Sequence, residues 1–224
     1  VRVGCTVDVL CPSGRPVEAG ASLLAATGPA AALLAGWKVA QTLMEYTSGI
    51  ATVAHRIVEA AHTVNPAVVV ACTRKTFPGT KALSLKAILA AGAVPHRLGL
   101  SETVLVFPEH RVFLAGEDDV AALARLKIAC PERKIVVEVN SLDEAVLAAR
   151  AGADVVQLEK FSPEAVAAVV ARLADTAAAV KVAAAGGVKP ANAAAYVRAG
   201  ARILVTSAPY FAPPADVKVS ISAC

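Results

Sequence analysis

The residues best suited to chemistry follow short apolar runs that have the composition of buried parallel strands. In an α/β barrel the reactive groups lie where strands end and loops begin, all on one face. We therefore expect one rim with several cations, two carboxylates and a glycine pair, which suits a phosphorylated substrate and a metal ion. The rim residues are Arg74, Lys75, Lys81, Lys86, His96, Arg97, Glu138, Glu159, Gly186, Gly187, Thr206 and Ser207.

Each of these features also has an ordinary structural interpretation. Arg74 and Lys75 could form a solvated loop, His96 could cap a helix, and the glycine pair could be only a tight turn. Two glycines between a strand and a helix, however, expose backbone N–H groups to a phosphate at the helix N-terminus. Glu138 lies inside the apolar run 135–139, where an unpaired carboxylate is costly, so it requires a structural ion pair or a role in a site.

Six apolar runs alternate with helical segments and would position the rim. This alternation favours an α/β barrel, with an open doubly wound sheet as the alternative. Ser141 and Glu144 predict a capping box, Ser162 begins another helix, and Gly152 and Gly200 end helices just before strands. The predicted strands are 68–72, 104–107, 135–137, 155–158, 180–184 and 203–205.

The two ends of the chain have a different pattern. Alternation over 1–9 predicts a half-buried strand, and Gly28-Pro29 opens a helix that Ser48-Gly49 interrupts before a second helix continues towards Ala61. The alternating tail 216–221 is expected to rejoin the sheet of this first section. We predict an N-terminal α/β domain over 1–65, to which 212–224 return, and a barrel domain over 66–211.

Composition limits the class of protein. Hydrophobic residues make up 56 % of the 224 residues and charged residues 18 %, which excludes global disorder. A formal charge of +4 is too small to indicate nucleic acid but suits a small polyanion. The uncharged stretch 19–37 is broken by glycines and Pro29, so we predict strand, turn and helix rather than a membrane span. Five cysteines without CxxC spacing argue against disulfides or zinc and favour a reducing, cytoplasmic location.

The run Thr73-Arg74-Lys75-Thr76-Phe77-Pro78-Gly79, followed by Lys86 and His96-Arg97-Leu98-Gly99-Leu100, resembles the signature of quinolinate phosphoribosyltransferases. The segment 48–52 resembles the family's upstream helix motif. Glu138 and Glu159 fall where the family has two barrel carboxylates, and Gly186-Gly187 falls on its glycine pair. The similarity covers nearly the whole chain. The similarity is greatest to the ModD-type branch, which is associated with molybdate transport and which the run 207–210 also resembles.

The resemblance implies that quinolinate is joined to 5-phosphoribosyl 1-pyrophosphate, with release of pyrophosphate and CO₂. The implied fold is an incomplete α/β barrel with an N-terminal α/β sandwich-like domain completed by the C-terminal tail. The implied assembly is a homodimer or larger homo-oligomer with sites at the interface, without nucleic acid. Lys38 stands where the family has an Arg that reaches the neighbouring subunit's site.

The resemblance also implies roles for the rim residues. Lys38, Arg74, Lys75, Lys86, His96 and Arg97 would bind the carboxylates and pyrophosphate of the substrates, and Gly186, Gly187 and Ser207 would bind the 5-phosphate. Glu138, Glu159 and Lys75 would be catalytic, with the two carboxylates holding ribose hydroxyls or Mg²⁺.

Four positions depart from the family pattern. Phe107 stands in place of a second barrel Lys, Glu159 replaces an Asp, Ala185 a Ser and Ser207 a Gly. Loss of the cation at 107 weakens the case for quinolinate more than the case for phosphoribosyl transfer. Two alternatives therefore stay open: a ModD-type paralogue whose different acceptor is linked to molybdenum metabolism, and a non-catalytic anion-binding protein.

Overall fold

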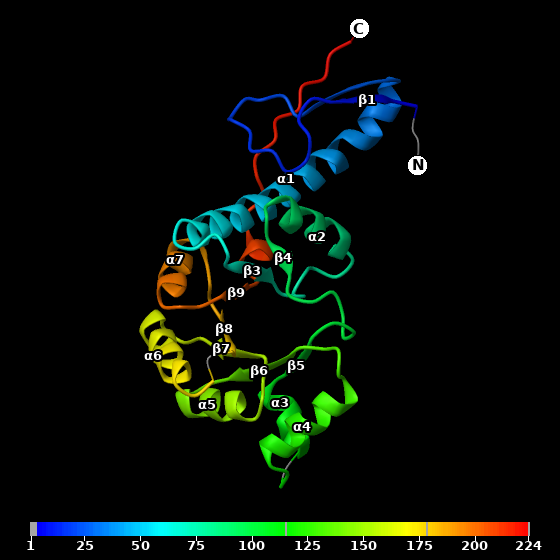
Figure 1. Ribbon diagram of the computed structural model, residues 1–224. Helices are drawn as coiled ribbons and strands as arrows, with labels where there is room; N and C mark the ends of the chain where they lie inside the picture. Colours follow the sequence, from blue (N-terminus) through cyan, green and yellow to red (C-terminus); the bar gives the residue numbers. More distant parts are fainter. Residues whose placement is uncertain (1–3, 115, 178, 224) are drawn as a thin grey trace.

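The computed structural model describes residues 4–114, 116–177 and 179–223. Seven parallel strands, in the order β4-β3-β9-β8-β7-β6-β5, curl into a half-barrel whose edge strands β4 and β5 do not pair with each other (Figure 1). This confirms the predicted incomplete barrel and its six strands, to which the structure adds the two-residue strand β4. The bounds are β3 (Val69–Cys72), β4 (Val94–Pro95), β5 (Val104–Val106), β6 (Ile135–Val139), β7 (Val155–Glu159), β8 (Lys181–Ala185) and β9 (Ile203–Thr206).

Helices cover the outer face of the sheet and begin where the sequence predicts. Ser141 Oγ accepts a hydrogen bond from Glu144 N, and Ser162 Oγ accepts one from Ala165 N, each at 3.2 Å. The helices are α2 (Lys81–Ala90), α3 (Pro108–Arg111), α4 (Asp119–Ala129), α5 (Leu142–Arg150), α6 (Pro163–Ala174) and α7 (Pro190–Arg198), with short 3₁₀ turns η1 (Val112–Leu114) and η2 (Ala208–Phe211).

The two faces of the curled sheet carry side chains of different size. Strand residues on the outer face pack with the helices into one large core that contains Ile135, Val156 and Leu204. The inner face forms a second, smaller cluster of mostly short side chains, with Phe107 and Ile203 packed against it. Its buried members are Leu105, Val136, Val155, Ala183, Ala185 and Val205.

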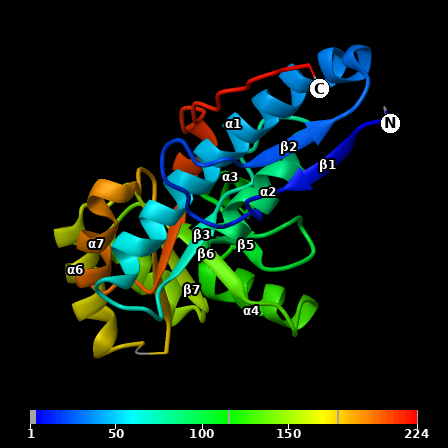
Figure 2. The same cartoon turned by 90° about the horizontal axis from the view of Figure 1, so that it is seen from above.

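The first section of the chain is built on one long helix. Helix α1 (Ala30–His62) runs without a break for 33 residues, so the predicted interruption at Ser48-Gly49 is wrong. Its C-terminal half packs on the barrel, whereas its N-terminal half extends away from it beside the antiparallel ribbon of β1 (Thr6–Val9) and β2 (Leu24–Thr27) (Figures 1 and 2). Residues 1–3 of the predicted first strand lie outside the described residues.

Gly49 remains in the helix because another segment crosses it there. Gly49 is buried, and a Cβ on it would collide with the carbonyl oxygen of Pro213. Glycine weakens a helix interior by about 1 kcal/mol relative to alanine, but here it permits the close approach of the tail.

The tail returns to the first section as predicted, but not as a strand. None of its described residues belongs to a β-ladder, so the expected strand 216–221 is wrong. Instead the tail follows α1 (Figure 2): Ala215 N donates to Glu45 O at 2.9 Å, Val217 N to Glu45 Oε1 at 3.3 Å, and Gln41 Nε2 to Val217 O. These helix groups satisfy the tail's backbone, so no ladder is needed.

Over the described ranges, none of the helices combines the length and the apolar character that crossing a bilayer requires. The stretch 19–37 forms β2, a turn and the start of α1, as predicted.

Two glycines of α1 give a matched test of the contact between the tail and the helix. At Gly36 an added Cβ meets nothing within 4 Å, whereas at Gly49 it meets Pro213. We expect Gly36→Ala to raise the free energy of unfolding by about 0.5–1 kcal/mol and Gly49→Ala to lower it by at least about 1 kcal/mol. Urea unfolding of both variants measures this. Equal stabilisation by the two substitutions would show that the tail does not lie against Gly49.

Candidate active site at the mouth of the half-barrel

The carboxyl ends of the parallel strands meet at one rim, which we call the mouth. Backbone hydrogen bonds join neighbouring loops there: Thr73 N donates to Thr206 O at 2.9 Å, and Lys160 N donates to Ala185 O at 2.8 Å. The structure brings most of the predicted site residues to this rim. They are Arg74 and Lys75 after β3, His96 and Arg97 after β4, Glu138 in β6, Glu159 at the end of β7, Gly186 and Gly187 after β8, and Ser207 after β9.

Glu138 is held by an amide. It pairs in register with Gln157 of β7, whose Nε2 donates to Glu138 Oε2 at 2.7 Å and whose side chain is only 3 % exposed. Burial raises the pKa of Glu138, the hydrogen bond from Gln157 opposes this, and the charges of Glu159 and Glu109 raise it further. Among the described residues no salt bridge forms at Glu138. The structural ion pair left open by the sequence is therefore not observed, which favours the predicted role in a site.

Glu159 lies against the glycine pair. Gly186 has a φ of 77°, and a Cβ on it would lie 2.7 Å from Glu159 Oε1. Lys160 is the one non-glycine residue of the described chain with a positive φ, 59°, and its Nζ lies 3.9 Å from Glu159 Oε1. Backbone strain of this kind is concentrated at functional sites. The close approach explains why position 186 requires glycine.

Gly187 leaves open space in front of a helix. Its φ is 100°, and an added Cβ would meet nothing within 4 Å. Asn192 Nδ2 donates to Gly187 O at 3.0 Å, and Lys189 N donates to Asn192 Oδ1 at 2.8 Å, which fixes the loop at the start of α7. A glycine loop held at a helix N-terminus suits a phosphate group.

The cations of the mouth lie near one another without acidic partners. Burial and the charge of Arg74 both lower the pKa of Arg97, and burial and the charge of Arg97 both lower the pKa of His96. Lys75 acts on Glu138 from β3 and lowers its pKa, so the two groups face the same space. Arg74, Lys75, Arg97 and His96 form no salt bridge within the described ranges. A bound anion would relieve their mutual repulsion.

For two predicted cations, the structure shows no hydrogen bond or ion pair to another predicted site residue within the described ranges. Lys86 is exposed on α2, with no hydrogen bond to any residue of the described chain. Lys38 lies in the extended half of α1, where its Nζ donates to Gln41 Oε1 at 2.8 Å and lies 4.2 Å from the centre of the Trp37 ring. Lys81, also predicted at the rim, donates to Leu98 O at 2.7 Å.

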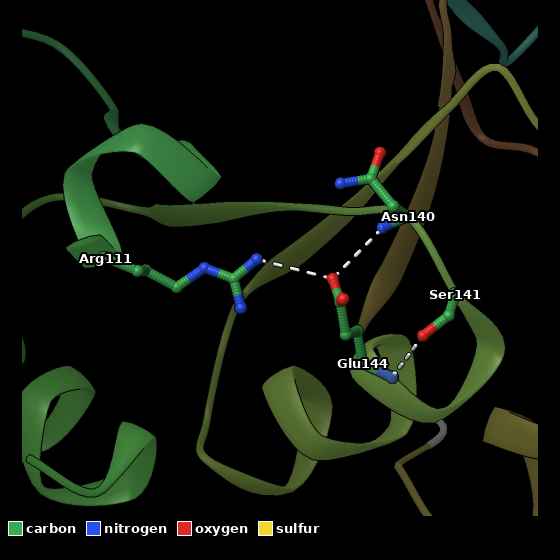
Figure 3. Close-up of polar contacts among 4 residues, drawn as sticks. All are labelled: Arg111, Asn140, Ser141 and Glu144. Atoms are coloured by element: carbon green, nitrogen blue, oxygen red, sulfur yellow. Dashed lines mark hydrogen bonds and ion pairs between the residues drawn. The ribbon is translucent and has the colours of Figure 1, made fainter. Parts of the chain in front are cut away.

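Sequence reasoning missed the groups that hold the site in place. Gln157 has a clear signal, because it is polar inside a run of buried residues. Figure 3 shows another: Arg111 Nη2 donates to Glu144 Oε2 at 3.3 Å, and the same oxygen accepts from Asn140 N at 3.1 Å. Glu144 therefore joins the loop after β6 to α3 after β5, instead of closing the predicted capping box on Ser141 N. The contact fixes two neighbouring strand ends of the mouth.

The predicted Mg²⁺ fits the two carboxylates only together with a substrate. Glu159 raises the pKa of Glu138, so their charges interact across one space. Among the described residues no three His, Cys, Asp or Glu side chains gather as a metal cage. Mg²⁺ is commonly bound by one or two carboxylates together with substrate phosphates. Glu138 and Glu159 would hold it in this way.

A half-barrel whose mouth combines unpaired cations, two carboxylates and a glycine loop defines a class of protein that binds phosphorylated polyanions. The chain belongs to the quinolinate phosphoribosyl transferase family. The model of that family's C-terminal domain matches residues 50–220, and the model of its N-terminal domain matches residues 2–48. The two matches meet inside α1, and the predicted domain division at residue 65 stays a prediction.

Several relatives carry the name "Putative pyrophosphorylase ModD". The one from Rhodobacter capsulatus is 56 % identical over 200 residues, which cover 89 % of this chain and 77 % of that protein. The one from Pasteurella multocida is 42 % identical over 96 % of this chain and 76 % of that protein. A human relative, nicotinate-nucleotide pyrophosphorylase [carboxylating], is 39 % identical over 73 % of this chain and 54 % of its own length. The predicted resemblance, including its ModD-type branch, is confirmed.

Solved structures show the same fold. The nicotinate-nucleotide pyrophosphorylase from Ehrlichia chaffeensis superposes with a TM-score of 0.86 at 18 % identity, over 95 % of this chain and 76 % of that one. NadC from Streptococcus pyogenes gives a TM-score of 0.82 at 23 % identity, over 95 % and 73 %.

The hydrogen bond from Gln157 gives a test of what sets the pKa of Glu138. We expect Gln157→Leu to raise the pKa of Glu138 above its already raised value, because the charged form loses its donor. Gln41→Leu, the same substitution on α1, should leave it unchanged. Carbon-13 NMR of labelled glutamate side chains measures both.

The same change has a consequence for stability. A carboxyl with a raised pKa in the folded protein makes stability fall as pH rises from its ordinary value through the raised value. This fall should extend to higher pH in Gln157→Leu than in the unmodified protein. A lower pKa of Glu138 in the variant would contradict the assigned hydrogen bond.

Proposed function

We propose that the protein transfers the phosphoribosyl group of 5-phosphoribosyl 1-pyrophosphate to an aromatic carboxylate and releases pyrophosphate. The observation that supports this most strongly is the mouth itself, where unpaired cations face two carboxylates and a phosphate-sized glycine loop. Quinolinate is the default acceptor, in which case CO₂ is also released. The ModD-named relatives support the alternative of a different acceptor, linked to molybdenum metabolism.

The residues of the mouth would bind different parts of the substrates, according to the charge of each residue. Arg74 and Lys75 bind the pyrophosphate, and Arg97 with His96 binds the carboxylate of the acceptor, since guanidinium groups suit oxyanions of this geometry. The loop of Gly186 and Gly187, with Ser207, holds the 5-phosphate.

The two carboxylates would act on the transition state. As the bond from the ribose to pyrophosphate breaks, positive charge develops on the sugar, and Glu138 and Glu159 lie where negative charge stabilises it. Mg²⁺, when it is bound with the sugar pyrophosphate, neutralises charge on the leaving pyrophosphate. Lys75 stabilises the same leaving group. Gln157 would hold Glu138 in place for this role, and its hydrogen bond favours the ionised form.

The proposed assembly is a homodimer with shared sites. Apolar side chains on the extended half of α1 and on the β1–β2 ribbon are exposed, and three of them, Val39, Leu43 and Tyr46, recur at helical spacing. An exposed apolar surface of this kind suits a protein partner. A second copy would cover it and bring Lys38 to the neighbouring mouth, which Lys38 does not reach within its own chain.

The activity has a direct test at Arg74. We expect Arg74→Ala to lose about 2–5 kcal/mol of charged contact with a substrate, seen as at least a tenfold weaker binding by calorimetry. Arg198→Ala, on an exposed turn at the far end of α7, is the control and should keep the original affinity. Pyrophosphate release from the sugar pyrophosphate, measured with several aromatic acids, tests the reaction. No release with any acid would leave only an anion-binding protein.

The shared site has a test by complementation. Arg74→Ala and Lys38→Ala chains should each be impaired, and mixing them should restore part of the activity, because one of the two sites in a mixed dimer has both residues intact. Light scattering should give a dimer. A monomer, or no recovery in the mixture, would contradict the shared site.

A further inference from the structure

The charges of the mouth are separated into two sides. The cations Arg74, Lys75 and Arg97 follow β3 and β4, whereas carboxylates occupy the β5–β7 side. Glu109, in α3 just after β5, and Glu159 both act on Glu138 and oppose its ionisation. An additional negative group placed on the β5–β7 side would meet this repulsion.

Phe107 forms the wall on the same side. Val106 pairs with Val137, so the next residues along the two strands, Phe107 and Glu138, are neighbours at the mouth. The Phe107 side chain is half-buried and packs on the inner apolar cluster that includes Leu105 and Val136. The wall beside Glu138 is therefore apolar as well as negative.

The orientation of Phe107 is fixed by its neighbour. Phe107 N donates to His110 Nδ1 at 3.1 Å, and the two rings lie 5.5 Å apart at 55°. The Arg111–Glu144 contact then holds the following turn against α5. The Phe107 ring is held by packing on the inner cluster and on the His110 ring, and its backbone is held by the hydrogen bond to His110, so it forms a preformed wall.

Among the described residues, no lysine near the end of β5 supplies a positive charge at this wall. Lys160 lies near Glu159 after β7, Lys81 donates to a carbonyl near β4, and Arg111 is paired with Glu144. Lys75 is the described cation that acts on Glu138, but it follows β3 on the other side of the mouth, where the proposed function assigns it to the pyrophosphate.

We infer that the acceptor subsite, which rests on the proposed function, takes an aromatic monocarboxylate that points its single carboxylate at Arg97 and His96 and an uncharged apolar edge at Phe107. An aromatic edge against Phe107 is favourable. A second carboxylate against Phe107 would lose its hydrating water without gaining a cationic partner. It would also lie beside the carboxylates of Glu138 and Glu109. The wall therefore selects against vicinal dicarboxylates such as quinolinate.

The test compares two acids that differ by one carboxylate, pyridine-3-carboxylate and pyridine-2,3-dicarboxylate. Calorimetry without the sugar pyrophosphate measures the binding of each, so no reaction occurs. We expect the unmodified protein to bind the monocarboxylate at least about tenfold more tightly, because like-charge juxtaposition is penalised. Phe107→Lys should tighten binding of the dicarboxylate at least about tenfold and weaken binding of the monocarboxylate, which loses its aromatic contact. Phe107→Leu, the uncharged control, should keep the original order.

Each other result contradicts a definite part of the account. If the unmodified protein binds or turns over the dicarboxylate better, or binds neither acid, the inferred selectivity is wrong, whether or not the Lys variant folds. If the protein does not bind 5-phosphoribosyl 1-pyrophosphate and releases pyrophosphate with no acid, the proposed function itself is wrong. A thermal unfolding scan of each variant separates loss of folding from loss of binding.

Discussion

The mouth of this half-barrel concentrates like charges, and among the described residues neither its arginines nor Glu138 forms a salt bridge. Seven parallel strands end at one rim, so the chain cannot spread Arg74, Arg97 and His96 apart, nor move Glu138 away from Glu159. Burial is the main cause of the lowered pKa of Arg97 and of the raised pKa of Glu138, and the charges of Arg74 and of Glu159 act in the same directions. A protein maintains such repulsion when a ligand relieves it, and a sugar pyrophosphate with its metal ion carries both kinds of charge needed.

The rest of the structure serves to keep these groups in place. Gln157 and the Arg111–Glu144 contact hold the carboxylate side, while Gly186 permits Glu159 to approach the phosphate loop. The inner face below the mouth carries mostly short side chains. Outside the barrel, α1 and the tail crossing Gly49 form an arm whose exposed apolar surface suits a second copy.

The sequence was sufficient to predict the barrel and the rim because both depend on local signals. Buried parallel strands are wholly apolar runs, and their ends are marked by charged residues and glycines. The features it missed depend on contacts between distant segments. Ser48-Gly49 has the pattern of a break, but Pro213 lies against Gly49 and the helix continues. The tail alternates like a strand, but Ala215 and Val217 bond to backbone and side-chain groups of α1 instead of to a strand. Gln157 was visible as a polar residue in an apolar run, yet only the register with Glu138 shows its purpose.

The central claim is that the mouth binds 5-phosphoribosyl 1-pyrophosphate through its cations on one side and its carboxylates, with Mg²⁺, on the other. Calorimetric titration of the unmodified protein with this compound, in the presence and absence of Mg²⁺, tests it most directly. The account predicts saturable binding with one site per chain, strengthened by Mg²⁺. Binding that is absent, or that inorganic pyrophosphate matches fully and Mg²⁺ does not alter, would contradict it.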